Sequence, residues 1–217
     1  MPDPGVGKTA VTHPGSVIHC WDHLVITLRD AGGSQTAFLS LYAIAYSASL
    51  GAGHVALLEV VVPPAGPFAA TLTDDLGLGR RQQDRLRAMG DERMMRTGPP
   101  RMASFTREPY GRDGFGFRIG FDGGEVHARW EDLDAPFWVD GQGGGFSASE
   151  DIWAMFVGAR RGTLTVGGIA VPGAPFDDEV WVPKLGRSLS SAHGAFAEVR
   201  VEPVSDRATG TAPDGPR

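Results

Sequence analysis

Most of the sequence consists of β-forming segments separated by glycine-rich turns, and this pattern constrains the fold more than any other feature. Two stretches have the hairpin pattern, "FDGGEV" at 121–126 and "VGGIAV" at 166–171. The sequence predicts an all-β fold of about ten strands that closes into a barrel or forms two packed antiparallel sheets, because open edges favour aggregation. The expected strands are rich in β-branched and aromatic residues: 16–30, 35–48, 54–62, 101–110, 114–122, 125–133, 151–160, 162–171, 178–185 and 194–203.

One segment, near 74–96, breaks the β pattern and predicts a short helix. Its sequence is rich in helix-forming residues and begins with two aspartates that can cap it, and Gly90 is expected to end or break it. Two interpretations stay open. The segment is a surface helix that links two groups of strands, or its methionines line a lid over a cavity mouth, since methionine adapts to irregular ligands.

The domain organisation follows from these segments. Residues 1–15 and 203–217 are rich in Pro, Gly, Asp and Thr and are expected to be disordered tails. Residues 16–202 form the predicted folded domain. "WDHL" at 21–24 and "WEDL" at 130–133 each precede a glycine-rich turn and an aromatic strand. Two interpretations therefore stay open. Residues 16–202 form a single domain, or they form two related halves, 16–72 and 101–202, that the helical segment joins.

Composition excludes several classes of partner. The net charge of −6 argues against nucleic acid, whose phosphates require a basic surface. No apolar run is long enough to span a membrane, and the N-terminus lacks the apolar core of a signal peptide. The single cysteine, Cys20, allows no intrachain disulfide and fits a reducing compartment, so we expect a cytoplasmic protein. The oligomeric state is not predicted.

No cofactor or metal is expected. "GVGKTAV" lacks the first glycine and the preceding strand of a phosphate-binding loop, and no dinucleotide-binding motif is present. His19 and His23 share one face of the first strand, but they stand about 13 Å apart at roughly 3.3 Å per residue. One metal ion cannot bridge that distance, because its ligand bonds are about 2 Å long.

The most unusual residue in the first strand is Asp22. It shares the even-numbered face with apolar residues, Ile18, Leu24 and Ile26 among them. If that face is buried, desolvation raises the pKa of the carboxyl group and suits it to general acid catalysis. The alternative is that Asp22 bonds a neighbouring backbone group or pairs with an arginine.

A second carboxylate and a set of aromatic residues complete the candidate site. Glu59 lies within "VALLEVVV", where both faces of the strand are apolar, so it is either a second catalytic carboxylate or the exposed residue of a half-buried strand. Aromatic side chains with a polar tip often line ligand pockets, and the alternative is that most of these residues belong to the core. The residues expected to bind a ligand are Trp21, His23, Tyr42, Tyr46, Trp130, Trp138 and Trp153.

The pair Trp21–Asp22 in "HCWDHLVITLRDAGG", followed by "LSLYAIAY", resembles the carotenoid-hydratase and hydroxyneurosporene-synthase-like proteins. "GFGFRIGFDGGEVHARWEDL" is similar to a later hairpin of that family. The resemblance implies a lipocalin-like fold and a cofactor-independent reaction on a hydrophobic molecule, since some members act as cyclases.

Three functions follow from the sequence. The first is a hydratase, isomerase or cyclase of secondary metabolism in which a buried carboxylic acid protonates a polyene, terpenoid or polyketide intermediate in a hydrophobic pocket. The second is a carrier of a small hydrophobic molecule without catalysis. The third is a glycan-binding β-sandwich that displays its tryptophans on an open face.

Overall fold

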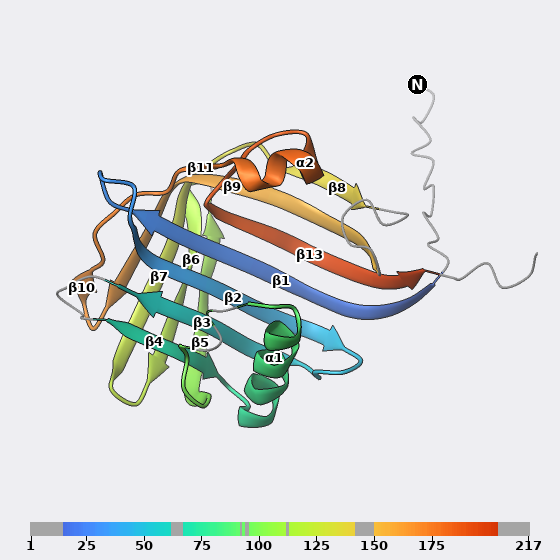
Figure 1. Ribbon diagram of the computed structural model, residues 1–217, viewed down its shortest axis with the longest axis horizontal. Coiled ribbons are helices and arrows are strands. Elements are labelled where there is room, and N and C mark those ends of the chain that lie inside the picture. Colours follow the sequence, from blue (N-terminus) through green and yellow to red (C-terminus); the bar gives the residue numbers. More distant parts are fainter. Residues whose placement is uncertain are drawn as a thin grey trace, which may run out of the picture.

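The computed structural model describes residues 15–61, 67–91, 93, 96–111, 113–141 and 150–203, and within them the chain forms a closed β-barrel (Figure 1). Strands make up 63% of the structure, nine of them close the barrel, and the only helices in the described ranges are short. The all-β, lipocalin-like prediction is confirmed. The expected tails lie outside the described residues, except for Gly15 and Pro203 at their inner ends.

The barrel follows the order β9-β13-β1-β2-β3-β4-β5-β6-β7 and closes where β7 pairs with β9. Strands from both halves of the chain therefore belong to one continuous circuit. The nine strands are β1 (Gly15–Arg29), β2 (Gln35–Ser47), β3 (Gly53–Val60), β4 (Phe68–Thr73), β5 (Arg101–Gly111), β6 (Gly114–Phe121), β7 (Gly124–Leu133), β9 (Asp151–Val166) and β13 (Ala192–Pro203).

Closure depends on the length of β9, which was expected as two strands and is one of 16 residues. Its first half lies between β13 and the added strand β8 (Phe137–Gly141), and its second half pairs with β7. Both expected hairpins are present. Asp122 and Gly123 connect β6 to β7, and Gly167 and Gly168 connect β9 to β10 (Ile169–Ala170). Both glycines of the second turn have positive φ, which glycine adopts without steric cost.

The seam between β4 and β5 differs from the rest of the barrel. It is the parallel pair in a circuit that is otherwise antiparallel, and its register joins only Leu72 to Arg101 and Thr73 to Met102. Helix α1 (Leu76–Ala88) connects the two strands, and its Gln83 lies beside this seam. The Gln83 Nε2 atom is 2.7 Å from Thr71 Oγ1, 3.2 Å from Thr97 Oγ1 and 2.9 Å from the Gly98 oxygen. One side chain thus joins the segment before β5 to β4.

The barrel interior is filled by side chains that alternate along the strands. From β1, Leu24, Ile26 and Leu28 point inward and are 0–1% exposed. Trp130 of β7 is also in this core, stacks on Phe115 and donates from Nε1 to the Val25 oxygen at 2.8 Å. The even-numbered face of the first strand is therefore the inner face, and the odd-numbered face is the outer wall.

The outer wall is covered by two helical elements. Helix α1 is capped by Asp75, which accepts from the Leu78 amide, and its chain reverses at Gly90, which has a φ of 81°. It is shorter than the expected 74–96 and packs through Leu78 and Leu86 on the wall. The predicted strand at 178–185 is wrong. That segment is a 3₁₀ turn, η2 (Glu179–Trp181), followed by the helix α2 (Val182–Leu185), with η2 capped by Asp178.

Candidate functional site

A pocket of about 390 Å³ opens at one mouth of the barrel and holds the candidate acid–base groups. We call it the mouth pocket. Small and apolar side chains form much of its surface, and charged groups are set among them. It is lined by Cys20, Trp21, Asp22, Ala43, Ile44, Ala45, His54, Arg107 and Ala197.

Asp22 and His54 face this pocket from two strands that flank a third. Asp22 of β1 pairs with Ala43 of β2, and Ala43 pairs in turn with His54 of β3. Residues opposite each other in adjacent strands point to the same side of a sheet. The small Ala43 side chain thus leaves open space between a carboxyl group and an imidazole, whose backbones stand about 10 Å apart at roughly 4.8 Å per strand.

Asp22 is tied to two donors. Arg107 of β5 reaches across the barrel mouth and its Nη1 lies 3.0 Å from Asp22 Oδ2, while the Ala197 amide donates to Oδ1 at 2.9 Å. The Asp22 side chain is 21% exposed. Of the two interpretations of Asp22 from the sequence, the structure has the arginine pair, so the carboxyl group is not surrounded by apolar groups alone. Its inward orientation is as expected.

His54 is oriented by Asp74, which follows β4. The His54 Nδ1 atom lies 2.8 Å from Asp74 Oδ2, and the His54 backbone amide donates to Asp74 Oδ1 at 2.8 Å. Since a carboxylate only accepts hydrogen bonds, Nδ1 carries the proton. The ring stacks on Phe105 with centroids 5.0 Å apart, so it is fixed on two sides. Nε2 makes no hydrogen bond within the described part of the chain, which leaves it available to a bound molecule.

Sequence reasoning missed three of these residues. His54 follows a glycine-rich turn and shares a face with Ala56 and Leu58, a signal that places it on the inner wall. Arg107 shares a face with Ala103 and Phe105 in the same way. Asp74 had no such signal, because β4, whose sequence is "FAATLT", was not expected as a strand.

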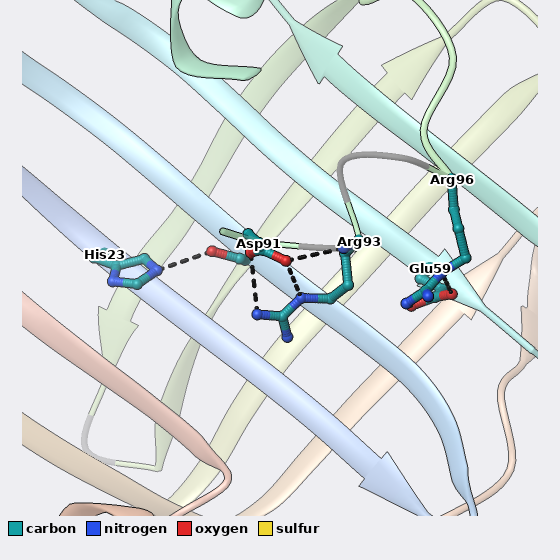
Figure 2. A network of polar contacts seen from close by, with 6 residues as sticks. His23, Glu59, Asp91, Arg93 and Arg96 are labelled. Carbon is teal, nitrogen blue, oxygen red and sulfur yellow. Dashed lines mark hydrogen bonds and ion pairs between the residues drawn. The ribbon is translucent and has the colours of Figure 1, made fainter. Parts of the chain in front are cut away.

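Glu59 lies apart from the mouth pocket. It is on the outer wall of β3, 14% exposed, and its Oε1 is 2.7 Å from Nε of Arg96 (Figure 2). It therefore does not join Asp22, and its ion pair explains how an otherwise apolar strand carries a carboxylate.

The expected ligand-binding aromatics are dispersed. Trp21 borders the mouth pocket, but its ring packs against Tyr42 in the buried cluster of the outer wall beneath α1. His23 and Tyr42 line a different groove on that wall. Trp130 is fully buried in the core, and Trp153 is partly buried on β9. Tyr46 and Trp138 are 49% and 71% exposed. Trp138 is the only mostly exposed tryptophan of the five, all of which are described, so they form no open platform.

Other site types find no support in the described ranges. They contain no group of three or more His, Cys, Asp or Glu residues that could hold a metal ion. No helix in them has the length and apolar character needed to cross a membrane. Cys20 is a free thiol at the edge of the mouth pocket.

The fold and this pocket define a closed all-β barrel with a histidine and a carboxylate that line one pocket at its mouth. No protein-family model, no curated protein and no solved structure matches this chain.

Proposed function

We propose that this protein is a cofactor-independent enzyme that moves protons on a small, largely apolar molecule bound at the barrel mouth. The observation that carries the proposal is the pairing of Asp22 and His54 across Ala43, with each group held by its own partner. A base and an acid fixed on two sides of an open space are what proton transfer within one substrate requires.

His54 is the principal proton carrier in this proposal. A carboxylate that accepts a hydrogen bond from Nδ1–H orients the imidazole ring. It also stabilises the positive charge that the ring gains when Nε2 takes a proton. His54 then takes a proton from one carbon of the substrate and returns it to another, which shifts a double bond. Asp74 stays a carboxylate throughout.

Asp22 is the second group. Its pair with Arg107 suits it to the roles of a carboxylate, which accepts a proton or stabilises a developing positive charge. In hydration or ring closure, the protonated His54 gives its proton to a double bond, and Asp22 takes a proton from the attacking water or from the cyclised cation. Compared with the expectation from the sequence, the donor in this scheme is His54 and Asp22 is its counterpart.

The substrate class rests on two arguments. The pocket walls contributed by Ala43, Ala45 and Ala197 suit an apolar body. The resemblance of the Trp21–Asp22 region to carotenoid hydratases and related cyclases favours a polyene, terpenoid or polyketide. Hydratase, isomerase and cyclase chemistry all fit the proton transfers described above.

The test compares the turnover of variants at the proposed site with that of a variant at a similar ion pair elsewhere. Asp22→Asn and His54→Gln remove the proposed groups, and Glu59→Gln is the matched control because Glu59 is also paired with an arginine but lies on the outer wall. Purified proteins are incubated with a panel that includes retinol, β-ionone and linear polyketide thioesters, and products are identified by mass spectrometry. Both site variants are expected to lose about 10²- to 10⁴-fold in turnover, with Glu59→Gln unchanged.

Other results would select another function. Binding of the apolar panel without any turnover by the parent protein would make it a carrier. Stabilisation by soluble oligosaccharides alone would favour glycan binding. Loss of turnover in Glu59→Gln with normal turnover in both site variants would contradict the mouth pocket as the active site.

A further inference from the structure

A second hollow, of about 240 Å³, lies on the outer wall of the barrel, on the other face of β1 from the mouth pocket. We call it the wall groove. The segment after α1 borders it on one side and η2 borders it on the other. Its lining comes from His23, Val25, Thr27, Phe38, Ser40, Tyr42, Asp91, Arg93, Asp178, Val180, Trp181, Ser191 and His193.

The border contributed by Asp91 and Arg93 is held against the wall. Asp91 binds Arg93 through both carboxylate oxygens, and Arg93 lies over the Phe38 ring at 3.9 Å. Arg96 pairs with Glu59 further along the wall, and Figure 2 shows both ion pairs together with His23. The groove therefore has a defined edge instead of an open one.

Flat rings dominate the wall groove. His23 stacks on Tyr42 with centroids 4.2 Å apart and planes 6° apart. His193 meets Trp181 edge to face, with centroids at 5.4 Å and an angle of 85°. Offset and edge-to-face ring contacts are favourable, so a surface of this kind selects a flat aromatic ligand.

One polar atom in the groove is left without a partner. His193 is only 4% exposed, and its Nδ1 lies 2.7 Å from the Ser190 oxygen. A carbonyl oxygen only accepts, so Nδ1 carries the proton and Nε2 is an acceptor. Within the described ranges Nε2 has no hydrogen bond. The other histidine is engaged, since His23 Nε2 lies 2.9 Å from Ser40 Oγ.

Both histidines are neutral at ordinary pH. Burial lowers the pKa of His23 to about 3 and that of His193 to about 4. The His193 Nε2 atom therefore keeps its lone pair and offers it to an O–H or N–H donor. The groove is also unsuited to anions, because Asp91 and Asp178 contribute two carboxylates against the single guanidinium of Arg93.

We propose that the wall groove binds a neutral phenol of one or two fused rings. The phenol O–H donates to Nε2 of His193, and the ring packs among Tyr42, Phe38 and Trp181. The volume is below the usual range for drug-sized ligands, which fits a ligand of this size. This site is separate from the mouth pocket and does not depend on the function proposed there.

The test uses 2-naphthol as the probe, with two analogues that change one property each. 2-Methoxynaphthalene keeps the rings and lacks the donor, and 2-naphthoate is an anion. Calorimetric titration of the full chain is expected to show 2-naphthol binding about 5- to 10-fold more tightly than the methyl ether, which is what one hydrogen bond provides. 2-Naphthoate is expected to bind more weakly than both.

His193→Asn identifies the acceptor. The Asn amide stands in for Nδ1 and its bond to Ser190, while Nε2 is removed. The variant should bind 2-naphthol and 2-methoxynaphthalene with nearly equal affinity. His54→Gln, in the mouth pocket, is the matched control and should keep the parent preference for the phenol.

A direct readout keeps the proposal testable if His193→Asn does not fold. In the parent protein labelled with ¹⁵N-histidine, 2-naphthol should shift the Nε2 resonance of His193 and leave that of His54 unchanged. Three results would each overturn the proposal. They are equal affinity of the parent protein for 2-naphthol and its methyl ether, an unshifted His193 resonance at saturation, and no binding of 2-naphthol at millimolar concentration.

Discussion

Asp22 and His54 are aligned through Ala43, so a carboxylate and an imidazole from separate strands face one space at the barrel mouth. Their partners come from two further places in the fold, Arg107 on β5 and Asp74 after β4. The constellation therefore exists only when the barrel is closed. Neither residue has its counterpart near it in the sequence.

Asp22→Asn should reduce stability only slightly. The ion pair with Arg107 is partly exposed, and such pairs contribute roughly 0.2–1 kcal/mol to the free energy of unfolding. Urea denaturation of Asp22→Asn, Arg107→Met and the double variant measures the coupling of the pair. A coupling well above about 1 kcal/mol would show that Asp22 has a structural role larger than its exposure indicates.

Two neighbouring glutamines of α1 should respond in opposite ways to substitution by leucine. Gln83 contacts Thr71, Thr97 and Gly98, so Gln83→Leu should cost about 1–3 kcal/mol, because it removes the buried amide that bonds Thr71 Oγ1 and the Gly98 oxygen. Gln82 is fully buried and its amide atoms have no partner in the described ranges. Gln82→Leu should therefore be neutral or stabilising. Thermal and urea denaturation compare the two, and a Gln82→Leu variant as unstable as Gln83→Leu would contradict the assignment.

Acid should destabilise the protein through its buried histidines. Burial lowers the pKa of His19 and His193 to about 4 and that of His23 to about 3. Between those values and about 6.5 the unfolded chain binds protons that the folded protein does not. The free energy of unfolding therefore falls as pH falls through this window, by up to about 1.4 kcal/mol per pH unit for each histidine.

Urea midpoints at pH 7.5, 6.5 and 5.5 test this dependence in a range where most carboxylates stay ionised. His193→Asn should show a shallower decrease than the parent protein. A midpoint that does not change between pH 7.5 and 5.5 would be incompatible with neutral, buried histidines.

Arg200 should be more important to stability than an ordinary surface arginine. It pairs with Glu198, whose side chain is 3% exposed, and with Glu150. Arg200→Met leaves the Glu198 charge buried without a counterion, and about 3–5 kcal/mol should be lost. Arg160→Met is the control, because Arg160 is 70% exposed in its pair with Asp134, and it should cost less than about 1 kcal/mol. Equal losses in the two variants would contradict the argument.

Local sequence patterns were sufficient for most of the fold. The inner and outer faces of β1 follow from alternation, and the turn at 167–168 follows from its two glycines. β4 was missed because "FAATLT" lacks the density of β-branched and aromatic residues that marks the other strands. The error at 178–185 arose from reading "EVWV" as β-forming, whereas the Asp178 cap and Pro183 begin helical turns there.

The site was only partly predictable, because its geometry depends on register and closure. Asp22 was found from its place in an apolar row. His54 lies opposite Ala43, and so near Asp22, only because of the register in which β2 pairs with β1 and β3. The hydrophobic pattern alone does not specify this register at the ends of the strands. The reach of Arg107 depends on β5 lying across the barrel from β1, which is a property of the closed circuit.

The sparse seam between β4 and β5 gives the barrel a preferred line of opening. Along every other junction a separating pair of strands must break a ladder of backbone hydrogen bonds, but here it must break two parallel register pairs and the side-chain contacts of Gln83. Amide hydrogen exchange should therefore be fastest at this edge of the barrel wall. Because Asp74 is bonded to His54 of β3 while Arg107 belongs to β5, such opening would move Arg107 away from Asp22 and leave the His54–Asp74 pair in place.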